Sequence, residues 1–236
     1  MGNLVEFRAA LQKLGSPEKA RLAARYFKTG AGEYGAGDTF IGVTVPMLRK
    51  LATSYEHLSM DDLETLLTGP IHEERMAALL ILVRQFGHGD EQTKRSVYDF
   101  YISHTEWVNN WDLVDCSAEY IVGSWLEDKN EKILETLAHS PLVWERRIAL
   151  LATFHYIKQG DSIEALKIIS IVLHDKHDLI QKATGWMLRE IGKRCGEDIE
   201  KGFLDKYYKT MPRTTLRYAI ERLPANVRAH YLARQP

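Results

Sequence analysis

Apolar residues recur along most of the chain at the three- and four-residue spacing of an amphipathic helix, and no convincing alternation of apolar and polar residues predicts a strand. Proline after serine, as at Ser16-Pro17 and Ser140-Pro141, suits the first turn of a helix. The pattern predicts an all-α protein of roughly a dozen helices. The clearest apolar sets are Met76, Leu79, Leu80, Val83 and Phe86; Ile148, Leu151, Ala152 and Phe154; and Ala183, Met187, Leu188 and Ile191.

A weak internal repeat relates similar segments of the chain at steps of 36, 36, 35 and 35 residues. A period of this length accommodates two helices and their turns, so it predicts an α-solenoid of antiparallel helix pairs. We expect residues 1–236 to form a single domain of this kind, with the equivalent residues on one side along a concave surface. These residues are Arg75, Trp111, Arg147, Lys182 and Arg217.

The segment Asn-Trp-Asp-Leu-Val-Asp at 110–115 is the strongest chemical signal. A helical wheel places Asp115 one turn after Trp111, at the edge of a stripe formed by Val114, Ala118, Ile121, Val122 and Trp125. A carboxylate between an aromatic ring and solvent is suited to stabilising a developing cation. Its structural alternative is an ion pair with a basic residue of the next repeat, such as Arg147.

Asp112 of the same segment has a simpler interpretation. If Asn109 caps the helix, Asp112 lies in the first turn, where a carboxylate interacts favourably with the helix dipole. We therefore assign Asp112 a structural role and Asp115 the chemical one.

Charge and composition limit the choice of partner and compartment. The formal net charge of −1 combines +4 over residues 1–50, −11 over residues 51–140 and +6 over residues 141–236. Total charge therefore says little about an anionic partner, and solvated helix faces are the simpler alternative. Two cysteines imply no disulfide framework, and neither a signal peptide nor a membrane span is recognisable. We expect a cytoplasmic, monomeric protein that needs no cofactor or metal.

Two further segments have some bearing on ligand binding. The glycines of residues 30–35 satisfy G-x-G-x-x-G, but a helix and not a strand precedes them, which favours a helix end and an ordered loop over a dinucleotide site. Lys28 beside this loop remains able to hold a phosphate. Trp186 is flanked by Lys182 and Arg189 at helical spacing, and Gly185 leaves room for close approach, so this tryptophan suits contact with a nucleic acid.

Taken together, these segments resemble the AlkD-type DNA alkylation repair glycosylases. The resemblance runs from about residue 16 to residue 222 and rests on residues 17–28, 111–115, 180–190, the Arg147 segment and the basic segment 213–217. It implies a HEAT-like solenoid that grips duplex DNA in a basic concave groove and excises cationic N3- or N7-alkylated purines without flipping the base.

The resemblance also implies roles for individual residues. Asp115 matches the catalytic aspartate, and Trp111 and Trp186 match aromatic residues that pack on the deoxyribose of the lesion. The residues expected to bind DNA are Tyr26, Lys28, Arg147, Lys182, Arg189, Arg213 and Arg217. Two departures from the family are the long loop 30–40 and His155, which stands where a lysine often contacts DNA.

Two other functions remain open from the sequence alone. A noncatalytic solenoid that recognises distorted duplex DNA would use the same basic residues without needing Asp115. A protein-interaction scaffold is the third alternative, since many α-solenoids serve that purpose.

Overall fold

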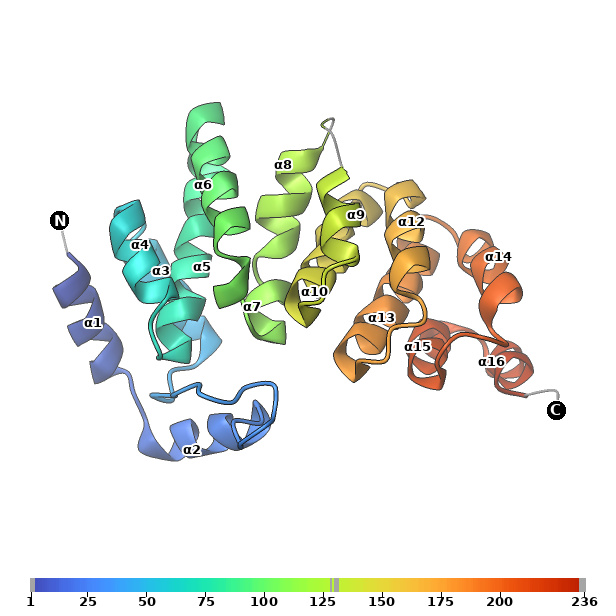
Figure 1. Ribbon diagram of the computed structural model, residues 1–236, viewed down its shortest axis with the longest axis horizontal. Coiled ribbons are helices and arrows are strands. Elements are labelled where there is room, and N and C mark those ends of the chain that lie inside the picture. The colour runs from blue at the N-terminus through green and yellow to red at the C-terminus, as the bar shows by residue number, and fades with distance from the viewer. Residues whose placement is uncertain (1–2, 128, 130–131, 234–236) are drawn as a thin grey trace. The chain divides into compact units, whose positions relative to one another are not determined.

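The computed structural model describes residues 3–127, 129 and 132–233, and the regular structure among them is helical (Figure 1). The only β-type pairing within these residues is one isolated parallel bridge between Thr39 and Ile71. The predicted all-α class is therefore confirmed. The chain divides into two compact units, Met1–Ile121 and Val122–Pro236, which are described separately. None of the helices formed by the described residues is long and apolar enough to cross a membrane.

The first unit is built around one long apolar helix, α5 (His72–His88), which packs against α3, α4 and α6 and also contacts α7. Its middle is apolar on every side, so it is buried all round. The other elements of this unit are α1 (Leu4–Lys13), α2 (Pro17–Tyr26), α3 (Val45–Ser54), α4 (Met60–Leu67), α6 (Glu91–Ser103), η1 (Thr105–Trp107) and α7 (Trp111–Asp115).

A π-helical segment, η2 (Glu119–Gly123), leads into the second unit. There the long helix α13 (Asp178–Arg194) packs against α10, α14 and α15. The remaining elements are α8 (Ser124–Leu126), α9 (Lys132–Ala138), α10 (Val143–Ala152), α11 (Phe154–Lys158), α12 (Ile163–Val172), α14 (Glu197–Tyr207), α15 (Arg213–Ala219), η3 (Ile220–Arg222) and α16 (Ala225–Leu232).

The helix that begins at Trp111 is much shorter than the sequence pattern predicts. Asn110 caps it by accepting a hydrogen bond from the Trp111 amide, and the helix ends at Asp115. A turn and the π-helical segment replace the continuous helix expected through Trp125, although Val114, Ala118, Ile121 and Val122 are fully buried as predicted. The N-cap is Asn110 and not Asn109, so that detail of the prediction was wrong.

The helix boundaries also change the register of the repeat. Arg147, Lys182 and Arg217 are each the fifth residue of their helix, and Arg75 is the fourth. Trp111 is the first residue of α7, so the position equivalent to the basic residues belongs to Asp115. The short 3-10 helix η1 and a three-residue loop precede Trp111.

The segment between α2 and α3 is fixed by one buried carboxylate. Glu73, near the start of α5, is 3% exposed and accepts hydrogen bonds from the backbone amides of Ile41, Gly42 and Val43, the shortest being 2.7 Å. Gly42 has a φ of +85°, and a Cβ atom there would lie 2.1 Å from the carbonyl oxygen of Ser16. The loop therefore reaches its position by close backbone packing that requires glycine.

We expect Glu73→Ala to lower the free energy of unfolding by about 2 kcal/mol, because it leaves buried amides without an acceptor. Urea denaturation measures this change. Glu74→Ala provides the matched control. Glu74 is as buried as Glu73, but its carboxylate pairs with the side chain of Arg8, which is 42% exposed and stays hydrated when the pair is lost. A loss no larger for Glu73→Ala than for Glu74→Ala would contradict the assigned role of Glu73.

Candidate functional site

The site predicted at residues 111–115 lies on α7, beside the C-terminal end of α2. Tyr26 and Phe27, at the end of α2, place their rings against Trp111, with centroids 5.9 and 5.3 Å away. The Phe27 ring is stacked on the indole at an interplanar angle of 20°, whereas Tyr26 meets it edge-on and stays 66% exposed. The structure therefore brings together Tyr26 and Trp111, two predicted site residues that are far apart in the sequence.

Asp115 is the last residue of α7, one turn after Trp111, and it is partly exposed. The next residue, Cys116, is a free cysteine. Burial, together with the charges of Asp112 and Asp115, raises the pKa of the Cys116 thiol far above its usual value. Its sulfur instead contacts the Leu113 carbonyl, at 3.3 Å. Helix α7 thus carries two carboxylates, Asp112 in its first turn and Asp115 at its end.

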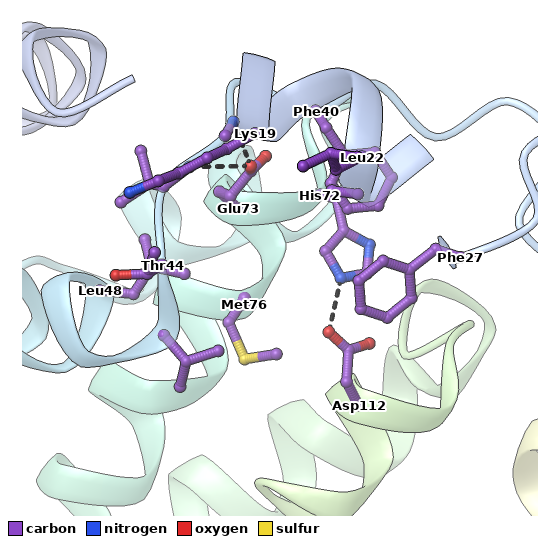
Figure 2. Close-up of a pocket in the computed structure, with 14 residues that line it drawn as sticks. Lys19, Leu22, Phe27, Phe40, Thr44, Leu48, His72, Glu73, Met76 and Asp112 are labelled. Atoms are coloured by element: carbon purple, nitrogen blue, oxygen red, sulfur yellow. Dashed lines mark hydrogen bonds and ion pairs between the residues drawn. The ribbon is translucent and has the colours of Figure 1, made fainter. Parts of the chain in front are cut away.

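Beneath this surface lies an ionic cluster that the sequence analysis did not find, centred on His72, the first residue of α5. Its ring nitrogens each face a carboxylate: Nδ1 is 2.9 Å from Oδ2 of Asp38 and Nε2 is 2.8 Å from Oδ2 of Asp112. Figure 2 shows the contact with Asp112 at the edge of a cavity. The side chains of His72, Asp38 and Asp112 are 3%, 7% and 12% exposed. We call these three residues and Arg75 the His72 cluster.

The charges of the His72 cluster stabilise each other. Burial opposes the cationic ring of His72, but its hydrogen bonds to Asp112 and Asp38 outweigh this and raise its pKa from 6.5 to about 9. Burial likewise opposes ionisation of Asp38, yet His72 and Arg75 together hold its pKa below its usual value. Two carboxylates and two cations therefore share one buried site near neutral pH.

The place of Arg75 in the repeat had suggested an exposed face, but Arg75 lies in this buried cluster. Its guanidinium is 3% exposed and donates to Oδ1 of Asp38 and to Oδ1 of Asn109. Asp112 keeps the helix-start role predicted for it, because its Oδ1 accepts from the Leu113 amide at 2.9 Å. Its second oxygen, however, binds His72, which a local reading of the sequence could not show.

A mainly apolar cavity of about 220 Å³ adjoins the cluster, between α2, α3, α5 and the segment that follows Asp38 (Figure 2). Its walls include Leu22, Phe27, Phe40, Leu48 and Met76, and His72 and Asp112 lie at one side. The described part of the chain contains no group of three or more acidic, histidine or cysteine side chains arranged to hold a metal ion.

The G-x-G-x-x-G segment forms the helix end and loop expected of it. Helix α2 ends at Tyr26, and Lys28 adopts a left-handed conformation with a φ of +52°. Lys28 is exposed and lies 5.9 Å from the centroid of the Tyr34 ring within this loop. The loop thus keeps Lys28 at the surface, two residues after Tyr26.

Trp186 belongs to the second unit, where it lies on α13. Its ring is 5.6 Å from that of Phe154 and is partly exposed. The sequence predicted that Gly185 leaves room for a ligand, and that prediction was wrong. A Cβ atom there would be 2.4 Å from the Thr215 carbonyl oxygen and 2.5 Å from Cβ of Tyr218, so this glycine allows α15 to pack closely on α13.

The basic residues predicted to bind DNA differ in exposure. Arg147 is 5% exposed and donates to the Leu179 carbonyl oxygen at 2.7 Å. Lys182 forms an ion pair of 2.6 Å with Asp178, and Arg189 pairs with Glu221.

On α15, Arg213 donates to the Leu232 carbonyl oxygen at 3.3 Å, whereas Arg217 is exposed. His155, which stands in the place of an expected lysine, lies 3.0 Å from a carboxylate oxygen of Glu127. Among the predicted DNA-binding cations, Lys28 and Arg217 are therefore exposed, and the side chain of Lys182 is 39% exposed.

The comparison with protein families gives a match that spans most of the chain. Residues 7–223 match the model of a family described as DNA alkylation repair enzyme. Because the match covers most of its length, the chain belongs to this family. The resemblance drawn from its motifs is confirmed. No curated protein was found to match it.

Several solved structures have a similar fold. A predicted DNA alkylation repair enzyme from Enterococcus faecalis superposes with a TM-score of 0.70 at 18% identity, covering 89% of this chain and 97% of its own. AlkD2 from Streptococcus mutans gives 0.55 at 18% identity, covering 94% of this chain and 100% of its own. The smu.31 protein of Streptococcus mutans UA159 gives 0.51 at 18% identity, with 92% and 96% covered. At this identity the likeness establishes the fold.

Proposed function

We propose that this member of the family is a DNA glycosylase that hydrolyses the N-glycosidic bond of cationic N3- or N7-alkylated purines in duplex DNA without flipping the base. The observation that carries the proposal is the arrangement on α7, where the partly exposed carboxylate of Asp115 lies one turn after Trp111. The exposed ring of Tyr26, at the end of α2, lies against Trp111. The proposal includes a monomeric protein that acts in the cytoplasm without a cofactor.

The chemistry follows from the charge on the substrate. An alkylated purine is already cationic, so it leaves C1′ with the bonding electron pair and becomes neutral without needing a strong general acid. The deoxyribose then develops positive charge, which the Asp115 carboxylate stabilises electrostatically. The same carboxylate orients the attacking water and accepts its proton as the oxygen bonds to C1′. The indole of Trp111 adds cation–π stabilisation at the sugar.

Base release is the decisive measurement for this proposal. We expect the protein to liberate 7-methylguanine or 3-methyladenine from methylated duplex DNA, leaving abasic sites, at rates well above spontaneous depurination. Chromatography of the released bases measures this directly. A protein that binds the duplex in a salt-dependent manner but releases neither base would instead be the noncatalytic DNA-binding alternative. A protein that does neither would fit the scaffold alternative.

The basic residues of the second unit supply a separate prediction about DNA affinity. We expect Lys182→Glu and Arg217→Glu each to weaken duplex binding about tenfold and to reduce its salt dependence, because each removes a phosphate contact. Fluorescence anisotropy over a series of salt concentrations measures both effects. Lys201→Glu is the matched control, since Lys201 pairs with Glu197 at the same helical spacing as Lys182 with Asp178. Equal affinities for all three variants would remove these residues from the DNA site.

A further inference from the structure

The His72 cluster joins three segments that are distant in the sequence: the loop at Asp38, the start of α5 and the helix α7. We propose that His72, as an imidazolium, is a positioning residue that holds α7, and with it Trp111 and Asp115, in place for base release. The link to base release rests on the glycosylase function proposed above, whereas the hold on α7 does not.

The hydrogen-bond geometry requires the cationic form of the ring. Each ring nitrogen of His72 lies within 2.9 Å of a carboxylate oxygen, and ionised carboxylates only accept hydrogen bonds. A neutral imidazole has one N–H, so it would leave one nitrogen lone pair facing the oxygen of Asp38 or Asp112. The imidazolium donates to both. Only that form therefore ties the loop and α7 to the same point on α5.

His72 reaches Trp111 by two routes. The first is covalent, because Asp112, which binds Nε2, is the residue after Trp111. The second is a stack of rings: Phe27 lies 5.0 Å from the imidazole and 5.3 Å from the indole, at 20° to the latter. Phe40 stacks on the imidazole at 4.6 Å. A shift of the His72 ring would therefore move both the first turn of α7, through Asp112, and the Phe27 ring that stacks on Trp111.

The ionisable groups around His72 come from the loop, α2, α5 and α7, and Lys19 and Glu73 line the same cavity. Asp38 faces it from the loop and Asp112 from α7, and Arg75 of its own helix reaches it through the second oxygen of Asp38. Asn110 adds a polar contact to Asp38 at 3.4 Å, and the Phe27 and Phe40 rings lie beside the imidazole. Because the pKa of His72 is raised to about 9, the cation persists at neutral pH and is lost in the alkaline range. The hold on α7 should weaken over that same range.

The first test reads the position of Trp111 without any substrate. The protein is labelled with 5-fluorotryptophan, and the Trp111 resonance is assigned by its loss in Trp111→Phe. The measurement is made in a Tyr26→Phe background, because the Tyr26 ring lies against the indole and its phenol is a second ionisable group that could shift the Trp111 signal at alkaline pH. We expect the Trp111 signal to shift between pH 7 and 10.5 with a midpoint near 9. In His72→Gln the signal should already differ at pH 7 and show no such midpoint.

A matched control comes from the same helix. His88, the last residue of α5, also pairs with a carboxylate, that of Glu56, but its side chain is 65% exposed. His88→Gln should leave the titration of Trp111 unchanged. If the wild-type signal has no alkaline midpoint, or if His72→Gln keeps one, the inference is overturned.

The second test measures base release in single-turnover reactions, corrected for spontaneous depurination. We expect the wild-type rate to fall in the alkaline range. His72→Gln should reduce the rate about tenfold at neutral pH and abolish that fall, since a small misplacement of catalytic groups is enough to cost this much or more. Adding Asp112→Asn to His72→Gln removes the carboxylate left unpaired and should restore part of the rate. A folded His72→Gln variant with the wild-type rate and pH profile would overturn the inference. A wild type that releases no base overturns the proposed function, and the fluorine titration then decides the hold on α7 by itself.

Discussion

Asp115→Asn should reduce the release of alkylated bases by about a hundredfold or more while leaving binding to duplex DNA intact. Asparagine keeps the size of the side chain but removes the negative charge that stabilises the developing sugar cation, an effect of ~3 kcal/mol on the transition state. It also removes the group that accepts a proton from the attacking water. Single-turnover release of 7-methylguanine, with anisotropy as the measure of binding, separates the loss of rate from any loss of affinity.

The control for this variant is Asp99→Asn. Asp99 is 62% exposed on α6 and pairs with Arg95 at the spacing of one helical turn, so removal of its charge should leave the rate unchanged. If Asp115→Asn and Asp99→Asn release bases at the wild-type rate, the carboxylate of Asp115 plays no part in catalysis. If Asp115→Asn loses binding in proportion to rate, its role is in holding DNA.

The second large effect is a dependence of stability on pH that originates at His72. Its pKa is 6.5 as an isolated side chain and about 9 in the folded protein. The stability contributed by its cation is therefore fully present below pH 6.5 and is lost as the pH rises through about 9. A shift of this size corresponds to ~3 kcal/mol of unfolding free energy, which is a large share of the stability of a typical domain.

Urea denaturation of the wild type and His72→Gln at pH 6 and pH 10 measures this contribution. The wild type should lose ~3 kcal/mol more than the variant between these pH values. His88→Gln, whose histidine is mostly exposed, should behave like the wild type. A variant and wild type that lose equal stability would show that His72 is not a buried cation. Asp38 acts at the acidic end of the pH range. Because its pKa is lowered in the folded protein, the stability that its carboxylate contributes is lost on acidification.

Much of the site on α7 was predictable from local sequence. The spacing of Trp111 and Asp115 and the polar residues before them predict a capped helix with a carboxylate one turn from an aromatic ring. The family resemblance added Tyr26, and the structure places its ring against Trp111. These features were accessible because they depend on spacing within one helix or on a match along the whole chain.

The His72 cluster could not be predicted from local sequence in this way. His72, Glu73, Glu74 and Arg75 are four consecutive polar residues at a helix start, a pattern typical of solvent exposure, yet each is only 3% exposed. Their partners are Asp38, Asn109 and Asp112, the backbone of the loop after Asp38, and Arg8. The one available signal was that these four residues lead directly into an uninterrupted apolar run, residues 76–83.

The sequence alone determined the helical class, the family and the one-turn spacing of Trp111 and Asp115, because helical periodicity and motif spacing are properties of neighbouring residues. The tertiary structure decided which charges are buried. Burial of a charge depends on whether an opposite charge arrives from elsewhere in the chain, since an unpaired one is too costly to remove from water. That is why Asp112, an ordinary helix-start acid in the sequence, became the link between His72 and the helix that carries Asp115.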